Sequence, residues 1–272
     1  IGSGRTGLCK NSRMLRQKRR YANLKLDRII AVRNDKTVYR DGEFCVKVFD
    51  SSHTKSDILS EALYQTMARE AGLNVPDVKR ITEIDERLSI ISDYIKGQTL
   101  DSLIRDNPQR RKEYLRIFTN TQLELQSKRC PLPGRKHDII GHAIMRTEFN
   151  APLRYDLGVR LSALPKLQKL CHGDFIPENL ILDESGNVYI LDWSRASLGN
   201  PAADAAISYL LMRYSGDRES ADLYLDLYTQ GSGIDIGRIR AWIPLAAAAR
   251  TAVARRTERE FLRPWVLGSE SI

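Results

Sequence analysis

The chain has 272 residues, 42% of them hydrophobic, which is enough to bury a sizeable core in one large domain or two small ones. Four scattered cysteines without a C-x-x-C pair argue against a zinc site or a disulfide framework and indicate a reducing compartment. No apolar run reaches the roughly 20 residues that a membrane span needs, and the N-terminus lacks a hydrophobic signal region, so we expect a cytoplasmic protein.

The positive charge is concentrated at one end of the chain. The formal net charge is +9, and the first fifty residues hold thirteen Lys or Arg against five Asp or Glu. Residues 1–20 contain seven basic and no acidic residues, so they form a basic N-terminal arm. This arm is the one segment that offers nucleic acid a binding site, but a solvated extension is the interpretation we favour.

After the arm, the pattern predicts β-structure. Residues 26–31, 37–39 and 44–49 are predicted strands, with a turn at 34–36 and a hairpin signal at Asp41-Gly42. A helix is predicted over 57–71, with Leu59, Leu63 and Met67 on one face. Two more strands are expected at 78–84 and 88–92.

The second half of the chain is predicted to be mainly helical. The predicted helices cover residues 100–129 with a break at Asn107-Pro108, 138–149, 157–170, 205–214, 221–230 and 235–261.

Residues 171–204 interrupt these helices and read CHGDFIPENLILDESGNVYILDWSRASLGNPAAD. Two short apolar strands, 180–182 and 188–191, flank a turn at 184–187. This hairpin brings Asp174, Asn179 and Asp192 to one edge of a sheet.

Those three side chains match the needs of phosphoryl transfer from a nucleotide. One carboxylate must accept the proton of the attacking hydroxyl, and hard oxygen ligands must hold Mg2+ against the phosphates. A lone D-x-x-x-x-N usually means polar residues in ordinary turns. Here it is part of the longer motif H-G-D-x-x-P-x-N. Two apolar strands follow, and after them come the motifs I-x-D-W and G-x-P-x-x-D. This combination favours the functional interpretation.

The stretch resembles the aminoglycoside phosphotransferase and choline kinase superfamily, small-molecule relatives of protein kinases, and the resemblance extends from about residue 27 onward. It implies an α+β, bilobal protein-kinase-like fold. A small antiparallel β-sheet N-lobe would span residues 21–94 and a mainly helical C-lobe residues 95–272. Ile176 stands where many relatives carry a second histidine, a departure that affects local packing.

The resemblance also implies roles for the residues of the stretch. Asp174 would be the catalytic base, and Asn179 and Asp192 would bind Mg2+ and, through it, the nucleotide. His172 would be structural, and Asp204 would brace the catalytic loop.

Further nucleotide contacts are implied in the N-lobe. Lys47 would contact the α- and β-phosphates of ATP (or GTP), and Glu61 would hold Lys47, with Glu70 as the competitor. The backbone of Asp93 and Ile95 would bind the base, which leaves ATP versus GTP open. The loop over the phosphates, at about residues 32–36, contains no glycine, so its amides approach phosphate less freely.

The acceptor is predicted to be a hydroxyl of a small molecule: aminoglycoside-like, sugar, amino alcohol or other metabolite. A cationic acceptor would favour carboxylates and aromatic faces. Candidates are Asp217, Glu219, Asp222, Asp226, Trp193, Tyr209 and Trp242. Against this, the segment 105–160 is rich in Arg and Lys, and Arg195, close after Asp192, would either steady the negatively charged loop or meet an anionic acceptor. These signals conflict, so the substrate class stays open.

Two alternatives remain. A protein kinase is opposed by the short distance from Asp192 to Asp204, which leaves no room for an activation segment with an A-P-E-like end. A nucleotide-binding pseudokinase, acting as a partner module, is favoured by the glycine-free loop and opposed by the intact set of Lys47, Asp174, Asn179 and Asp192.

Overall fold

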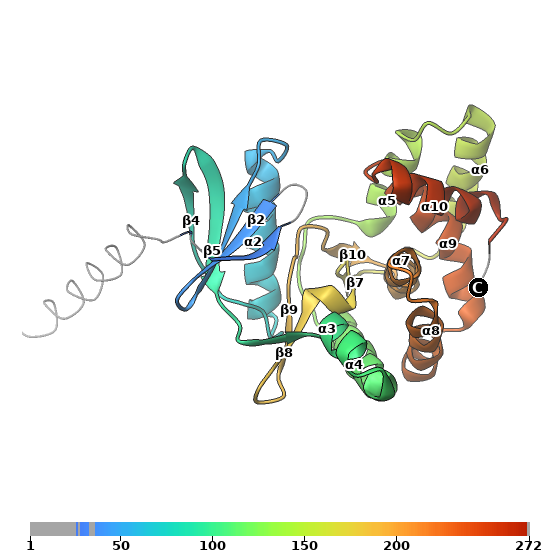
Figure 1. Ribbon diagram of the computed structural model, residues 1–272. Helices are drawn as coiled ribbons and strands as arrows, with labels where there is room; N and C mark the ends of the chain where they lie inside the picture. Colours follow the sequence, from blue (N-terminus) through green and yellow to red (C-terminus); the bar gives the residue numbers. More distant parts are fainter. Residues whose placement is uncertain (1–25, 27, 33–35, 271–272) are drawn as a thin grey trace, which may run out of the picture. The chain divides into compact units, whose positions relative to one another are not determined.

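In the computed structural model, residues 26, 28–32 and 36–270 are described (Figure 1). These described residues divide into two compact units, one made of those up to 58 together with 78–94, the other of residues 59–77 and 95–270. An antiparallel sheet comes first in the chain and a mainly helical part follows, so the predicted α+β class is confirmed. Across these described ranges, no helix has both the length and the apolar character needed to cross a bilayer.

The first unit is a five-stranded antiparallel sheet. Its strands are β1 (Ile29–Val32), β2 (Lys36–Asp41), β3 (Phe44–Phe49), β4 (Val78–Ile84) and β5 (Arg87–Asp93), in the order β1-β2-β3-β5-β4. Alternate residues of β3, Phe44, Val46 and Val48, point to one face and form a core with Ile91 of β5. The β4–β5 turn places Asp85 and Glu86 at φ 48° and 62°, which suits the twist of a tight hairpin.

The predicted strands of this unit are largely confirmed, with one shift. The first strand was expected over 26–31, but Leu26 lies in a turn and β1 begins at Ile29. The pairing of β1 with β2 is irregular between Ile29 and Ala31, which alternation alone does not reveal. Residues 34 and 35 of the predicted turn lie outside the described residues, and Lys36 belongs to β2.

Helix α2 (Lys55–Glu70) begins with a reciprocal cap, because Thr54 N donates to Asp57 Oδ2 (3.1 Å) and Asp57 N donates to Thr54 Oγ1 (3.2 Å). The buried face differs from the predicted one. Leu59 and Leu63 are 42% and 51% exposed, whereas the polar residues Glu61 and Gln65 are buried. The apolar spacing was misleading because two of the buried positions carry polar side chains.

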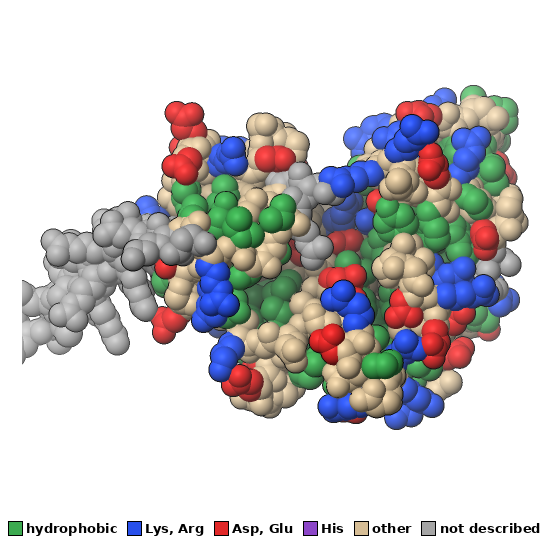
Figure 2. Space-filling model, in the orientation of Figure 1, with side chains coloured by type: hydrophobic (Ala, Val, Ile, Leu, Met, Phe, Trp, Pro, Cys, Tyr) green, Lys and Arg blue, Asp and Glu red, His purple; other side chains and the backbone are tan. Residues whose placement is uncertain are grey.

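The second unit contains the other helices. They are α3 (Leu100–Asp106), α4 (Arg111–Ser127), α5 (Lys136–Met145), α6 (Ala151–Ser162), α7 (Pro201–Tyr214), α8 (Arg218–Ser232), α9 (Ile236–Thr251) and α10 (Arg256–Leu267). Helix α7 packs against α8 and α9, while α10 and α5 both pack against α9. The face seen in Figure 2 mixes Lys and Arg side chains with Asp and Glu over these helices.

Two small sheets carry the segment that was singled out in the sequence. Strands β6 (Gly97–Thr99), β8 (Leu180–Asp183) and β9 (Val188–Ile190) form one, in the order β6-β8-β9, and β7 (Lys169–Cys171) pairs antiparallel with β10 (Ser197–Gly199). Gly97 is required where β6 meets β8, because a Cβ there would lie 2.3 Å from the carbonyl oxygen of Leu182.

Three helix predictions are corrected. The helix expected over 138–149 ends at Met145. The helix expected over 157–170 ends at Ser162, because Pro165 disfavours helical backbone at Leu164, and residues 169–171 form β7 instead. The long helix expected over 235–261 is two helices, α9 and α10, separated by a turn in which Val253 and Ala254 donate to the carbonyl of Arg250.

Candidate active site

A buried carboxylate holds the start of the loop that follows β7, at residues 172–173. Asp204, in the first turn of α7, is 0% exposed. Its Oδ1 accepts from the backbone N–H of Gly173 (2.7 Å), and its Oδ2 accepts from that of His172 (3.2 Å). The bracing of the catalytic loop that the resemblance implies is therefore present as two charge-assisted hydrogen bonds.

A second layer of buried polar groups supports Asp204. Gln122 of α4 donates through Nε2 to Asp204 Oδ2 (3.3 Å), and the Tyr224 hydroxyl of α8 donates to Gln122 Oε1 (2.7 Å). Burial raises the pKa of Tyr224 well above its usual value, so the hydroxyl keeps its proton. Sequence reasoning missed this layer, because Gln122 and Tyr224 lie far from the loop in the chain.

His172 has a structural environment. Its ring is buried, with Nε2 2.9 Å from the carbonyl oxygen of Leu191 and Nδ1 accepting from the backbone N–H of Asp174 (3.3 Å). Burial lowers its pKa, although Asp204, Asp174 and Asp192 act in the opposite direction. The imidazole is therefore neutral, with its proton on Nε2. Its two hydrogen bonds connect the loop to the residue that follows β9.

Asp174 and Asn179 contact each other directly. Residues 177–179 form a short 3-10 turn that begins at a proline, and this turn brings Asn179 back over the loop. The Asn179 Nδ2 donates to the Asp174 carbonyl (2.9 Å) and Oδ2 (3.3 Å). The Asn179 carbonyl accepts from Leu191 N (2.8 Å), which ties the turn to the end of β9.

Asp192 follows that end of β9 in an unusual backbone conformation. Its φ of 61° lies in the left-handed region, which few residues other than glycine, asparagine and aspartate adopt. Ser194 Oγ donates to its Oδ1 (3.2 Å). The bonds of Asn179 to Asp174 and to Leu191 thus connect the three predicted residues of the hairpin.

The donor chemistry of this group suits Mg2+. Because the Asn179 nitrogen is turned toward Asp174, its Oδ1 is the atom left to bind a cation, and Asp192 supplies carboxylate oxygens. The described part of the chain contains no cluster of three His, Cys, Asp or Glu residues that could hold a metal. Mg2+ does not require such a cluster, since water and phosphate oxygens complete its octahedral shell.

Two cations next to the loop were not assigned roles from the sequence. Arg250 of α9 donates through Nη1 to Asp174 Oδ1 (3.4 Å), and its Nε pairs with Glu258 of α10. Lys136, the first residue of α5, is 4% exposed, and its Nζ donates to the carbonyl of Arg195 (3.2 Å). Both cations come from helices distant in the chain, so no local pattern signals them.

The remaining predicted nucleotide contacts are distributed over both units. Lys47 lies in the central strand β3, opposite Val38 and Ile90, and Asp93 ends β5. Glu61 and Ile95 belong to the second unit. The pairing of Lys47 with Glu61 and the contacts of Asp93 and Ile95 with a base stay predictions.

Most of the residues predicted to bind a cationic acceptor have other roles. Trp193, Tyr209 and Trp242 are at most 2% exposed, so their faces are packed in the core. Asp217 caps α8 by accepting from Ser220 N (2.9 Å).

Two further acidic candidates of α8 are also engaged. Glu219 pairs with Arg111 of α4, and Asp222 accepts from the Tyr209 hydroxyl (3.2 Å). These carboxylates therefore stabilise α8 and its contacts.

A family model described as the phosphotransferase enzyme family matches residues 30–242. One curated relative, the uncharacterized protein YcbJ of Bacillus subtilis (strain 168), is 34% identical over 70 residues, which are 25% of this chain. That match spans only 22% of the relative's own length.

Solved structures share the fold. A thermostable mutant of aminoglycoside phosphotransferase APH(4)-Ia matches with a TM-score of 0.68 at 15% identity, over 95% of this chain and 99% of that one. Choline kinase LicA from Streptococcus pneumoniae matches with a TM-score of 0.62 at 16% identity, over 95% and 98%. A choline/ethanolamine kinase family protein from Mesorhizobium loti gives 0.61 at 16%, over 90% and 86%. The predicted kinase-like fold is thereby confirmed.

Proposed function

Because the chain belongs to the phosphotransferase enzyme family, we propose that it is a Mg2+-dependent kinase that transfers the γ-phosphate of ATP or GTP to a hydroxyl of a small molecule. The observation that carries the proposal is the connected group of Asp174, Asn179 and Asp192, set on a loop that Asp204 holds in place.

Asp174 is the proposed catalytic base. Its carboxylate is held on one side by Asn179 Nδ2 and on the other by Arg250 Nη1, so its orientation is fixed before an acceptor arrives. Asp174 accepts the proton of the acceptor hydroxyl as the hydroxyl oxygen bonds to the γ-phosphorus. The bond from that phosphorus to the oxygen it shares with the β-phosphate breaks, and the nucleoside diphosphate leaves.

Asn179 and Asp192 are the proposed Mg2+ ligands. When bound, Mg2+ neutralises the charge that develops on the phosphate oxygens. The left-handed backbone of Asp192 and the hydrogen bond from Ser194 fix where its carboxylate points. The nucleotide contacts expected from the sequence, Lys47 paired with Glu61 and the backbone of Asp93 and Ile95, belong to the same proposal.

Complexes of similar proteins support nucleotide and small-molecule partners. LicA was solved in complex with AMP, at 17% identity to this chain and a TM-score of 0.64. A thermostable APH(4)-Ia mutant was solved as a ternary complex with AMP-PNP and hygromycin B, at 17% identity and a TM-score of 0.62. The cytoplasmic location inferred from cysteine usage stays a prediction.

The test is Mg2+-dependent turnover by the purified protein with ATP and with GTP, against aminoglycosides, amino alcohols, sugars and organic acids. Acceptor-stimulated turnover that Asp174→Ala lacks would support the proposal. Tight nucleotide binding without turnover on any acceptor would favour the pseudokinase alternative, and absence of nucleotide binding would rule out both.

A further inference from the structure

Glu258 lies on the buried face of helix α10. Leu262 and Trp265 follow it at the spacing of one and two helical turns, and both are buried. The Glu258 side chain is itself only 12% exposed. A largely buried carboxylate needs a partner, and this partner is Arg250 of α9, whose Nε donates to Glu258.

Arg250 joins two carboxylates through different nitrogens. Its Nε donates to Glu258, and its Nη1 donates to Asp174 Oδ1 (3.4 Å). The Arg250 and Asp174 side chains are 19% and 20% exposed, so water screens their charges only partly. Because a guanidinium is planar and rigid, the place where its Nε is held also determines where its Nη groups lie. Glu258 therefore helps to hold Nη1 against Asp174.

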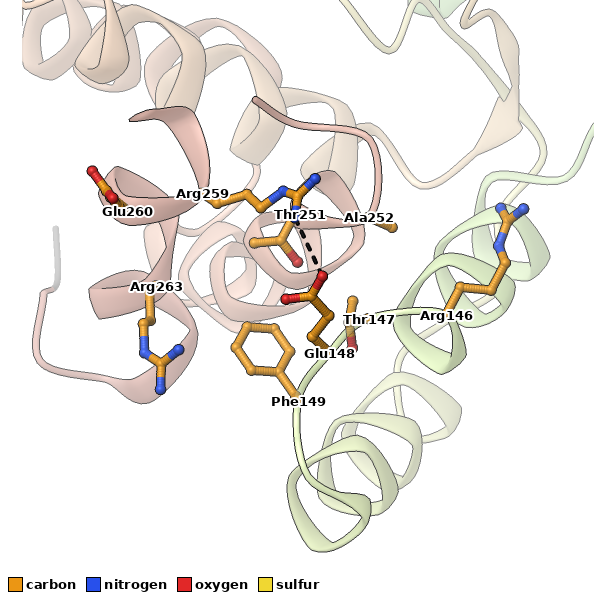
Figure 3. Close-up of a pocket in the computed structure, with 9 residues that line it drawn as sticks. All are labelled: Arg146, Thr147, Glu148, Phe149, Thr251, Ala252, Arg259, Glu260 and Arg263. Atoms are coloured by element: carbon orange, nitrogen blue, oxygen red, sulfur yellow. Dashed lines mark hydrogen bonds and ion pairs between the residues drawn. The ribbon is translucent and has the colours of Figure 1, made fainter. Parts of the chain in front are cut away.

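The start of α10 is anchored to its surroundings, which fixes Glu258 relative to α9. The backbone N–H of Ala254 donates to the carbonyl of Arg250 (3.0 Å) in the turn between the two helices. Arg259, which directly follows Glu258, donates through Nε to the carbonyl of Ala254 (2.8 Å). Its Nη1 donates to Glu148 (3.4 Å), and Figure 3 shows this bond reaching from α10 to the segment that follows α5. The first turn of α10 is thus held by two neighbouring segments.

Glu258 also gives Arg250 a counter-ion that the reaction does not consume. In the proposed reaction, Asp174 accepts the proton of the acceptor hydroxyl and loses its negative charge. Arg250 then still has Glu258 as its partner, so proton transfer leaves no unpaired cation in this largely buried place.

We propose that Glu258 is a positioning residue for phosphoryl transfer, which acts on the base Asp174 through Arg250. The proposal rests on the proposed function and adds α10 to the elements that orient its base. Arg250 and Glu258 both lie beyond residues 30–242, so the matched part of the family pattern contains neither of them.

The test compares kcat and KM for variants of the full chain with Mg2+ and ATP. The acceptors are kanamycin, choline, glucose and glycerate, and the one that the wild type phosphorylates fastest is used for every variant. ATP hydrolysis, in which water is the acceptor, is used if none of them reacts. Glu258→Ala should lower kcat about tenfold or more, while the KM for ATP changes by less than about twofold.

Glu260→Ala is the matched control for this variant. Glu260 lies on the same helix and forms its ion pair with Arg256 (3.0 Å) rather than with Arg250. Alanine favours helical backbone at both positions, so α10 should form in either variant. We expect kcat to stay within about twofold of the wild-type value in Glu260→Ala.

A double variant tests whether Glu258 acts through Arg250. Arg250→Met should lower kcat by about 10–100-fold, because it frees one side of the Asp174 carboxylate. Adding Glu258→Ala to Arg250→Met should then lower kcat by less than about twofold further. Urea midpoints show that each variant is folded under the assay conditions.

Three results would overturn the proposal: an unchanged kcat in Glu258→Ala, an equal loss in Glu260→Ala, or a further tenfold loss when Glu258→Ala is added to Arg250→Met. Wild-type turnover separates these failures from a failure of the proposed function. Absence of any wild-type transfer, to an acceptor or to water, would remove the proposed function and this proposal together.

Discussion

Asp204→Asn tests how the catalytic loop is held. Asp204 is fully buried, and its two oxygens accept the backbone N–H groups of Gly173 and His172 at 2.7 and 3.2 Å. Asparagine keeps the shape of the side chain but removes its charge and replaces one acceptor by an NH2 donor. One of the two backbone N–H groups is then left facing another donor.

The expected loss follows from those two bonds. A hydrogen bond to a charged group contributes about 1.5–3 kcal/mol, and a buried donor without a partner costs about 1–3 kcal/mol. We expect Asp204→Asn to lower the free energy of unfolding by about 2–4 kcal/mol. Asp204→Ala removes both acceptors and should lower it by about 3–5 kcal/mol.

Tryptophan fluorescence in urea measures this loss in the relevant part of the chain. All three tryptophans, Trp193, Trp242 and Trp265, are buried in the second unit, so the signal reports its unfolding. With a slope of about 2–3 kcal/mol per molar urea, the midpoint should fall by about 1 M. Asp226→Asn, the same change at an exposed position of α8, is the control. An unchanged midpoint in Asp204→Asn would refute the bracing role.

Three further predictions concern the same loop and its support. Gly173→Ala should lower turnover at least about tenfold, because the φ of Gly173 is +80° and a Cβ there would lie 2.5 Å from the backbone oxygen of Arg195. Gly158 has open space around it, so Gly158→Ala should not lower turnover in the same kinetic assay. The pKa of His172 is depressed on folding, so the stability that its neutral ring contributes is complete above its unfolded pKa of about 6.5 and is lost as the pH falls toward the folded value. The urea midpoint should therefore be lower at about pH 5 than at about pH 7.5, and this difference should shrink in His172→Gln. Tyr224→Phe removes the donor to the buried Gln122 Oε1 and should lower the free energy of unfolding by about 1–3 kcal/mol in urea titrations, whereas an unchanged midpoint would show that Gln122 finds another donor.

The parts of the site that the sequence predicted are local in the chain. Strand β3 begins and ends at the predicted residues, and Asp174, Asn179 and Asp192 lie within one hairpin-bearing segment. Alternating apolar residues and turn signals act over a few positions, so they locate such elements well.

The missed parts are contacts between distant segments. Arg250 is 76 residues from Asp174 in the sequence, and the Tyr224 hydroxyl reaches Gln122 across 102 residues. Arg250 also lies beyond residues 30–242, where the family model matches, so the family pattern does not supply it either. On α2, the apolar spacing gave the wrong buried face, because tertiary packing buries Glu61 and Gln65.

The most direct test of the proposed chemistry separates the base from the metal ligand. We would measure nucleotide affinity with and without Mg2+, and turnover on the best acceptor, for wild type, Asp174→Asn and Asp192→Asn. Asp174→Asn should bind the Mg2+ nucleotide normally while turnover falls by about 10²–10⁴-fold. Asp192→Asn should lose the gain in affinity that Mg2+ provides. Full turnover by Asp174→Asn, or an unchanged Mg2+ effect in Asp192→Asn, would contradict the assignment of these residues.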